Sequence, residues 1–276
     1  MKSSLAILIA VLVFVLAACF NGGASPSSGL SSTVRATATA QAHLTIFAAA
    51  SLKGVLDKAR TAYEAAVPGM SLTISTDSSS ALETQIEQGA PADVFLSADT
   101  TNPRKLVDAG LADGVAVTFA SNELTVIVPT DNPAGIQSAA DLARPGVRVI
   151  AAGDEVPITN YATQFVGNLA NEVGYSASFV ADYTRNIASK EDNVKAVVAK
   201  IELGEGDAAI VYVTDARAST KVATVEVPAS ANVLASYAGV VVRASADAAA
   251  GKAFLDWFAG PDGQAILTGF GFLSPS

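Results

Sequence analysis

Uncharged hydrogen-bond donors stand at places where a strand pattern gives way to a helix pattern. Ser51 is the first of these donors, and Ser78-Ser79-Ser80 opens a later helix pattern. The first turn of a helix has backbone N–H groups without intrahelical partners and a partial positive charge, so it can hold an anion. For Ser51 alone, capping of its own helix is the simpler interpretation, and the three serines could be a capping cluster on a solvated loop.

Two further helix starts and one phenol have the same uncharged character. Pro157 fixes φ at the third helix start and leaves the amide of Ile158 free. The amide of Val194, at the fourth start, is among the unpaired first-turn N–H groups. Tyr212 ends a very apolar strand pattern, where it could also be a core tyrosine with a locally satisfied hydroxyl. If the fold brings these groups together, they suit a desolvated oxyanion.

The residue types that most enzymes need are scarce in this chain. His43 is the only histidine and Cys19 the only cysteine, so neither a Ser-His-Asp triad nor a His/Cys metal site is expected. The sequence has no G-x-S-x-G motif and no glycine-rich phosphate loop. For Asp93 and Asp99 we favour capping and turn bonding over catalysis. The sequence therefore predicts a protein that is not an enzyme.

The elements that must position these donors alternate between strand and helix patterns. Residues 44–47 alternate with period two, and the helix pattern that begins near Ser51 has a period of 3.6. Such alternation favours parallel sheets with helices on both faces, and ligands then bind at the carboxyl ends of strands against helix starts. The other strand patterns are 72–76, 93–97, 124–128, 147–151, 208–213, 222–227 and 233–243. The other helix patterns are 81–88, 103–109, 139–143, 159–173, 193–203 and 246–259.

The N-terminal residues have the features of an export signal. Residues 5–18 form an apolar run of fourteen residues, which suits a signal peptide and is short for a membrane span. The sequence Leu16-Ala17-Ala18-Cys19 resembles the lipobox of bacterial lipoproteins, which implies cleavage before Cys19 and lipid attachment to it. An ordinary signal peptide with a stray cysteine is the alternative. We therefore predict a signal peptide over 1–18, and a lipidated Cys19 with a flexible, Gly-, Ser-, Ala- and Thr-rich tether over 19–42.

Charge and length limit the function of the remaining body. The net charge is −9 and no basic block is present, so we expect no nucleic-acid partner. An acidic protein also repels anions at long range, and an anion site must then work through short, local hydrogen bonds. Residues 43–276 are enough for two modest domains or one large one. A monomer is expected, because one binding site suffices for one ligand.

Longer stretches of the body form distinctive motifs. They are residues 47–52, 85–99 and 206–216, with shorter matches at Asn122 and at Gly269-Phe270-Gly271-Phe272. These motifs resemble the periplasmic molybdate-binding proteins of ABC importers, and the resemblance covers nearly all of residues 43–272. The stretch that ends at Asp99 is the most distinctive part, whereas the serines alone would not be specific.

The resemblance implies the fold and the function. The fold is α/β, of the two-lobed periplasmic-binding-protein-like type II, with a mixed sheet flanked by helices in each lobe and the ligand in the interlobe cleft. Lobe 1 is 43–121 plus 228–276, and lobe 2 is 122–227. The implied function is an extracytoplasmic lipoprotein, in the periplasm or at the outer face of the cytoplasmic membrane. It captures molybdate, and tungstate as well, for the permease of an ABC transporter. No cofactor is implied, and molybdenum enters only as the bound oxyanion, not as a free metal cation.

The resemblance also implies the binding residues. Ser51 and Ser79 give hydroxyl and amide donors from lobe 1, whereas Ile158 and Val194 give backbone amides and Tyr212 its hydroxyl from lobe 2. Binding then closes the lobes like a hinge. One departure concerns the turn before the third helix, where Pro157-Ile158-Thr159 replaces Pro-Ala-Gly. The larger side chains could narrow the pocket or shift the loop, and the hydroxyl of Thr159 could add a donor.

Three alternatives remain open at the level of sequence. The same fold could bind sulfate, another small anion or a small organic acid, and the altered turn at Ile158 motivates this version. A related two-lobed scaffold could carry an enzyme, although it would need a titrating group in the cleft. A sensor module could pass its signal to a membrane receptor instead of a permease.

Overall fold

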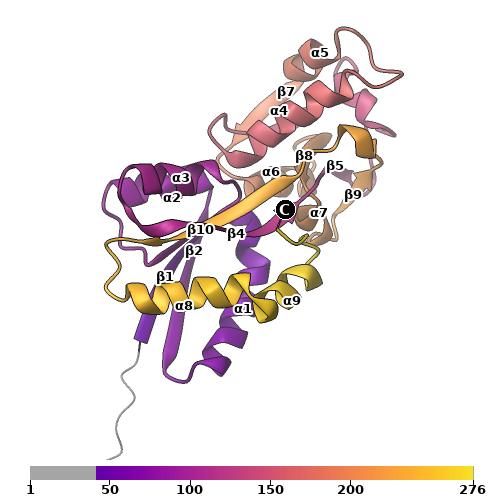
Figure 1. Ribbon diagram of the computed structural model, residues 1–276. Coiled ribbons are helices and arrows are strands. Elements are labelled where there is room, and N and C mark those ends of the chain that lie inside the picture. The colour runs from indigo at the N-terminus through magenta and orange to yellow at the C-terminus, as the bar shows by residue number, and fades with distance from the viewer. Residues whose placement is uncertain (1–41, 276) are drawn as a thin grey trace, which may run out of the picture. The chain divides into compact units, whose positions relative to one another are not determined.

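Strands and helices alternate along the chain, and the strands collect into two separate sheets. The computed structural model describes residues 42–275, and each of its two sheets has five strands (Figure 1). Both sheets belong to the same compact unit of the chain. The predicted signal peptide, Cys19 and all but the last residue of the predicted tether lie outside the described residues; that last residue, Ala42, begins the first strand.

The first sheet has the strand order β2-β1-β3-β10-β4. Strand β1 (Ala42–Ala49) pairs in parallel with β2 (Met70–Asp77) and with β3 (Val94–Ser97). Strand β10 (Ala235–Val242) runs antiparallel to both β3 and β4 (Ala112–Asn122). The sheet is therefore built from two distant parts of the sequence.

The second sheet has the strand order β7-β6-β8-β5-β9. Strand β6 (Val149–Ala152) pairs in parallel with β7 (Ile187–Glu191) and β8 (Ala208–Tyr212). Strand β5 (Leu124–Pro129) runs antiparallel to β8 and to β9 (Val222–Val225). Parallel pairs thus form only one part of each sheet.

The mixed sheets confirm the predicted fold class and correct one expectation from the alternating patterns. Alternation alone favours parallel sheets, but β5 and β10 both run antiparallel to their neighbours. Each of them enters its sheet when the chain crosses over from the other sheet, not through a crossover helix on its own sheet. A strand that enters in this way is not constrained to the parallel direction.

Helices cover both faces of the first sheet (Figure 1). Helices α1 (Lys53–Ala66), α8 (Ala248–Ala259) and α9 (Pro261–Gly269) pack on one face. Helices α2 (Ser79–Glu87) and α3 (Thr101–Asp108) pack on the other. The sheet therefore separates two layers of apolar side chains.

Aromatic side chains join α1 and α8 to the sheet. The ring of Tyr63 meets that of Phe254 edge to face, with their centroids 5.1 Å apart. Phe258 stacks on Phe254 at 5.8 Å and also contacts Phe119 of β4 at 5.2 Å. Buried aromatic pairs of this kind each contribute about 0.5–1.5 kcal/mol beyond the burial of their area.

The second sheet packs against α4 (Pro157–Leu169), α5 (Phe179–Arg185), α6 (Val194–Glu202) and α7 (Val213–Arg217). The prediction that the helix beginning near Thr159 continues to Val173 is wrong, because α4 ends at Leu169. Val173 is fully exposed, so it has no apolar surface to pack on and adds nothing to the buried stripe. Three 3₁₀ turns complete the part of the chain between residues 42 and 275: η1 (Ala50–Leu52), η2 (Ala139–Ala143) and η3 (Ala229–Ala231).

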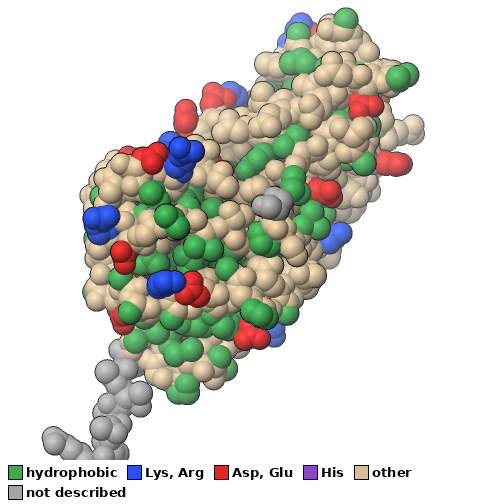
Figure 2. Space-filling view, in the orientation of Figure 1, with side chains coloured by type: hydrophobic (Ala, Val, Ile, Leu, Met, Phe, Trp, Pro, Cys, Tyr) green, Lys and Arg blue, Asp and Glu red, His purple; other side chains and the backbone are tan. Residues whose placement is uncertain are grey.

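Charged side chains form no single patch on the visible face of the molecule (Figure 2). On the face shown in Figure 2, Lys, Arg, Asp and Glu side chains are scattered among polar and apolar ones and do not gather in one patch. None of the helices in residues 42–275 combines the length and the apolarity that crossing a membrane requires.

Candidate functional site

A small cavity lies where the starts of α2, α4 and α6 meet the ends of β1, β3 and β8. Its volume is about 10 Å³, which is room for roughly one water-sized sphere. None of the described residues that line it carries a charge. They are Ala49, Ala50, Ser51, Ser78, Ser79, Ala98, Val156, Pro157, Ile158, Asn193, Val194 and Tyr212. All five residues that the sequence predicts for an oxyanion site are in this lining.

Ser51 has a different role from the capping role that its position in the sequence favours. It lies inside η1, and α1 begins only at Lys53 with no side-chain cap. Its Oγ is 3.1 Å from the Oη of Tyr237, which comes from β10. Burial raises the pKa of Tyr237 well above its ordinary value, so the phenol keeps its proton. When Tyr237 donates to Ser51, the hydroxyl proton of Ser51 remains available to a guest in the cavity.

The neighbouring serines at the start of α2 divide two tasks between them. Ser78 is the N-cap, and its Oγ accepts a hydrogen bond from the amide of Ala81 at 3.2 Å. Ser79 is almost completely buried, and its Oγ accepts from the amide of Ala98 at 3.0 Å. Because Ser79 accepts in this bond, its own proton is free to donate into the cavity.

Backbone amides approach from the second sheet. Ile158 and Val194 stand in the first turns of α4 and α6, where the N–H groups have no intrahelical acceptor. The Oδ1 of Asn193 accepts from the amide of Ala196 at 3.1 Å, which satisfies another donor of the first turn of α6. The amide at Val194 is therefore left for a partner outside the helix.

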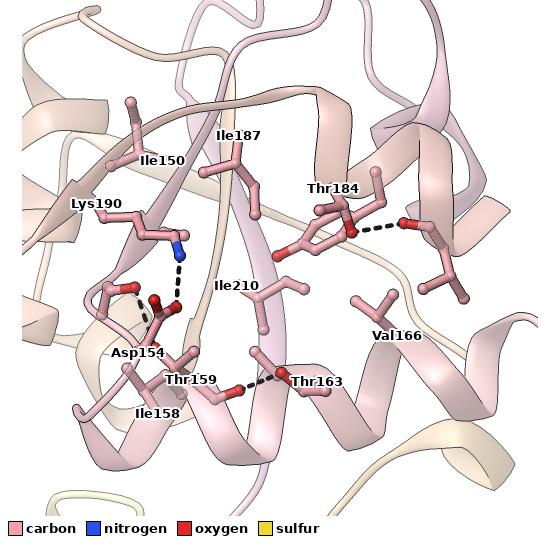
Figure 3. A pocket seen from close by; sticks show the side chains of 15 residues that line it. Ile150, Asp154, Ile158, Thr159, Thr163, Val166, Thr184, Ile187, Lys190 and Ile210 are labelled. Carbon is pink, nitrogen blue, oxygen red and sulfur yellow. Dashed lines mark hydrogen bonds and ion pairs between the residues drawn. The ribbon is translucent and has the colours of Figure 1, made fainter.

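The turn Pro157-Ile158-Thr159, which replaces Pro-Ala-Gly at the start of α4, keeps the amide of Ile158 at the cavity. Thr159 is not among the residues that line the cavity, and its Oγ1 donates to the carbonyl oxygens of Ala152 and Gly153 at 3.1 and 2.8 Å. The expectation that the Thr159 hydroxyl adds a donor to the site is therefore wrong. The side chain of Ile158 also lines a second cavity on the far side of the turn (Figure 3).

The phenol of Tyr212 is the most informative group in the cavity. Its side chain is 1% exposed, and its Oη has no hydrogen-bond partner in the described part of the chain. Burial, followed by the neighbouring Tyr237, raises the pKa of Tyr212 well above its ordinary value, so the group remains a neutral donor. The alternative of a core tyrosine with a satisfied hydroxyl is wrong. A buried, unpaired O–H is costly, so this phenol is a donor that an acceptor in the cavity would satisfy.

An ion pair between a partly exposed lysine and a buried aspartate, which sequence analysis did not find, lies behind the cavity. The Nζ of Lys195, in the first turn of α6, is 2.9 Å from Oδ1 of Asp215 in α7. Burial raises the pKa of Asp215, and Lys195 opposes that rise. Because Asp215 contributes to the raised pKa of Tyr212, its carboxylate helps to keep the phenol protonated. Only the contact between α6 and α7 could have revealed this pair, since 20 positions separate the residues in the sequence.

The two sides of the cavity are also joined directly. The Nδ2 of Asn193 donates to Oδ1 of Asp77 at 3.0 Å, which links the start of α6 to the end of β2. Tyr161 of α4 donates from its Oη to the carbonyl oxygen of Ser236 in β10 at 3.4 Å. These contacts hold donors from the two sheets around one small volume.

The aspartates considered for catalysis have structural roles, as the sequence predicts. Asp99 accepts from the hydroxyl of Ser97 at 2.8 Å and from the side chain and amide of Asn102 at 2.9 and 3.0 Å. Asp93 accepts from the amide of Thr45 at 2.7 Å. The two aspartates flank β3 at opposite ends, so they cannot act as a catalytic pair.

The single histidine lies at the end of β1 away from the cavity. The Nδ1 of His43 is 3.0 Å from the Oγ of Ser71 in β2. Within residues 42–275, no group of three or more His, Cys, Asp or Glu side chains is arranged to hold a metal ion. The chemistry that the cavity supports is hydrogen bonding to a small acceptor-rich anion.

Comparisons with known proteins agree on one class. A sequence profile described as bacterial extracellular solute-binding protein matches residues 44–273. The chain is 33% identical to the molybdate-binding protein ModA of Mycobacterium tuberculosis over 270 residues, which covers 96% of this chain and 95% of the relative.

Solved structures share the fold. The periplasmic molybdate-binding protein of Azotobacter vinelandii superposes with a TM-score of 0.71 at 25% identity, over 84% of this chain and all of that one. The sulfate-binding protein SubI of Mycobacterium tuberculosis superposes with a TM-score of 0.74 at 21% identity, over 84% of this chain and 86% of that one. At that identity the second likeness concerns the fold alone.

Proposed function

This chain belongs to the bacterial extracellular solute-binding proteins, and we propose that it captures molybdate, and tungstate as well, for an ABC transporter. The ligand is supported by the 33% identity to the molybdate-binding protein of Mycobacterium tuberculosis. The permease of the transporter is then the partner that receives the anion.

The observation that carries the proposal is the unpaired hydroxyl of Tyr212 in a cavity whose lining is uncharged. In the proposed complex, Ser51, Ser79 and Tyr212 donate their hydroxyl protons, and Ile158 and Val194 donate their backbone amides. A tetrahedral dianion has the acceptor oxygens that these groups lack. The cavity as described has room for only about one water-sized sphere, so the donors from the two sheets move apart to admit the anion and then close around its oxygens.

The affinity for the anion can be estimated from the strength of hydrogen bonds to a charged acceptor. A hydrogen bond to a charged acceptor contributes about 1.5–3 kcal/mol net, and more in a site closed to water. A handful of such bonds reaches sub-micromolar affinity after the cost of closing the site, although the terms are not additive. No full positive charge is needed within the lining.

The remaining parts of the proposal concern organisation and location. We propose two lobes, 43–121 plus 228–276 and 122–227, which close on the anion like a hinge. The protein is exported by a signal peptide over 1–18, tethered by 19–42 and anchored by a lipid on Cys19, and it acts as a monomer. Its family consists of solute-binding proteins, and we assign it no catalytic step and no cofactor.

Isothermal titration calorimetry with molybdate, tungstate, sulfate and phosphate tests the proposed ligand. We expect saturable heat with molybdate and tungstate, and little displacement of molybdate by sulfate. An absence of heat with both molybdate and tungstate would overturn the proposal. If sulfate displaced molybdate, the same cavity would be assigned to sulfate instead.

A further inference from the structure

A second cavity of about 200 Å³ lies between the second sheet and helices α4 and α5 (Figure 3). Most of its wall is aliphatic, with Ile150, Ile187 and Ile210 from the strands and Val166 from α4. An apolar protein cavity of about 150 Å³ is large enough to bind benzene. The aliphatic part of this cavity can therefore hold a small organic molecule rather than an inorganic ion.

Two side chains of this cavity have N–H or O–H groups without an acceptor among the described residues. Lys190 lies at its rim beside Asp154, with which it forms an ion pair (Figure 3), and two of its three N–H bonds remain for another acceptor. Tyr183 also lines the cavity, is 8% exposed, and makes no side-chain hydrogen bond with the described residues. The rim and the wall thus each present a donor.

The threonine hydroxyls of the cavity offer no further donors, because their protons are already in use. Thr163 donates to the carbonyl oxygen of Thr159 at 2.8 Å, and Thr184 donates to that of Val180 at 2.7 Å. Thr159 donates to backbone carbonyls as described above. A ligand that fits must therefore bring its own acceptors to Lys190 and Tyr183.

We propose that this cavity is a second ligand site, which binds a short aliphatic carboxylate. The carboxylate oxygens accept from Nζ of Lys190 and Oη of Tyr183, and the aliphatic chain lies among Ile150, Ile187 and Ile210. Burial raises the pKa of Tyr183 to about 12, so this phenol donates throughout the physiological range. The carboxylate of Asp154 also lines the cavity, but it is 75% exposed and already paired with Lys190, so Lys190 and Tyr183 are the groups that favour an acid over an amine.

Occupancy of the second site is transmitted through Ile158. This residue lines both cavities, since its amide belongs to the start of α4 beside Tyr212 and its side chain belongs to the wall of the second cavity. A ligand that fills the second cavity restrains the first turn of α4 and tightens anion binding. By linkage, the anion then tightens carboxylate binding by the same factor. This coupling step, unlike the site itself, rests on the proposed function.

Calorimetry of the purified protein with 4-methylpentanoate, in buffer without oxyanion, tests the site. We expect saturable binding that weakens about tenfold or more in both Tyr183→Phe and Lys190→Met. Tyr175→Phe and Lys252→Met are matched controls outside the cavity and should leave the affinity unchanged. The proposal is overturned if 4-methylpentanoate gives no binding, if the controls lose as much affinity as the test variants, or if 4-methylpentan-1-amine binds better than the acid.

A steric variant provides a second, independent test. Ala162 of α4 lines the cavity and is partly exposed, so the larger side chain of Ala162→Leu occupies part of the space that the ligand needs. We expect it to abolish binding of 4-methylpentanoate while the thermal unfolding transition remains cooperative. Undiminished binding by a folded Ala162→Leu protein would place the probe elsewhere and contradict the proposal.

The coupling is measured separately. The affinity for molybdate is determined with and without saturating 4-methylpentanoate, and a several-fold increase is expected. If both ligands bind but neither alters the affinity for the other, transmission through Ile158 is wrong and the site stands. If molybdate does not bind at all, the proposed function fails, whereas the titration without oxyanion still decides the second site.

Discussion

At the scale of residues, the ability of the cavity to bind an anion depends on which hydroxyl groups already donate their protons to other acceptors. Ser78 caps α2, which leaves Ser79 free to donate, and Tyr237 holds Ser51 in place from another strand. Tyr212 has no partner at all among the described residues. Three neutral donors therefore face one small volume, and the loss of any one of them should weaken an anion complex.

Tyr212→Phe should lower the affinity for molybdate by roughly 10- to 100-fold, which corresponds to one charge-assisted hydrogen bond of about 1.5–3 kcal/mol. The ring remains, so the packing against Tyr237 at 5.6 Å is kept and the free energy of unfolding should not fall. Calorimetry and urea unfolding measure the two effects. Tyr63→Phe, at a buried position outside the cavity, is the control. Unchanged molybdate affinity in Tyr212→Phe would remove this phenol from the site.

Ser79→Ala should weaken molybdate binding by a similar factor, while Ser80→Ala should not. Ser80 belongs to the same helix start but is not part of the cavity lining. Ser79→Ala also leaves the amide of Ala98 without its acceptor, and we expect the protein to lose about 1–3 kcal/mol of stability. Titration calorimetry of both variants makes the comparison. Equal losses of affinity in both would show that the helix start matters and the Ser79 hydroxyl does not.

The sequence predicts the residues that line the cavity, but it does not predict the residues that hold them in place. Helix starts and a phenol at the end of an apolar strand are local patterns, and the five predicted residues do line one cavity, although their role in binding stays a prediction. Tyr237 is 186 positions from Ser51 and lies in a strand that reads only as apolar. Nothing local in the sequence indicates that these two side chains meet.

At the scale of elements, several of those that no sequence pattern predicts are short or only partly buried. No sequence pattern predicts strand β4, because its first half is largely exposed and shows no alternation. Strand β7 at the edge of its sheet is likewise only partly buried. Helices α5 and α7 are short, with seven and five residues, so the helical period hardly develops in them. Their formation depends on tertiary contacts.

Gly263→Ala tests the close approach of α9 to α8. A Cβ at Gly263 would lie 2.0 Å from the backbone oxygen of Phe258, and a backbone atom cannot move aside as a side chain does. We expect a loss of about 1–3 kcal/mol or more in the free energy of unfolding, measured with urea. Gly269→Ala in the same helix meets nothing within 4 Å and should be neutral or slightly stabilising. Similar stability of the two variants would contradict the packing described here.

At the scale of the whole described body, the chain passes from the first sheet to the second and back. The first passage follows Asn122, whose Nδ2 donates to Oγ1 of Thr214 at 2.8 Å, and whose Oδ1 accepts from the amide of Glu123 at 3.0 Å. The return passage leads to β10. Sequence patterns predict helices and strands but not the points where the chain crosses between the sheets. The two-lobed arrangement therefore rests on the resemblance alone.

Buried tyrosines predict a loss of stability at alkaline pH. Burial raises the pKa of Tyr183 to about 12 and raises those of Tyr212 and Tyr237 well above their ordinary value, whereas an unfolded chain titrates near 10. The folded state therefore holds these protons more tightly, and the associated stability is complete below pH 10 and is lost as the pH rises toward 12 and beyond. For Tyr183 this amounts to roughly 2–3 kcal/mol. Urea unfolding between pH 8 and 12 should show the fall, and Tyr183→Phe should make it shallower; a flat profile in the unmodified protein would contradict the burial of these phenols.

The most direct test of the central claim is a crystal structure of the protein grown with molybdate, in which anomalous scattering locates the molybdenum atom. We predict one molybdenum between the two sheets, with its oxygens within hydrogen-bond distance of the hydroxyls of Ser51, Ser79 and Tyr212 and of the amides of Ile158 and Val194. A molybdenum atom elsewhere, or one whose oxygens do not meet Tyr212, would contradict that claim.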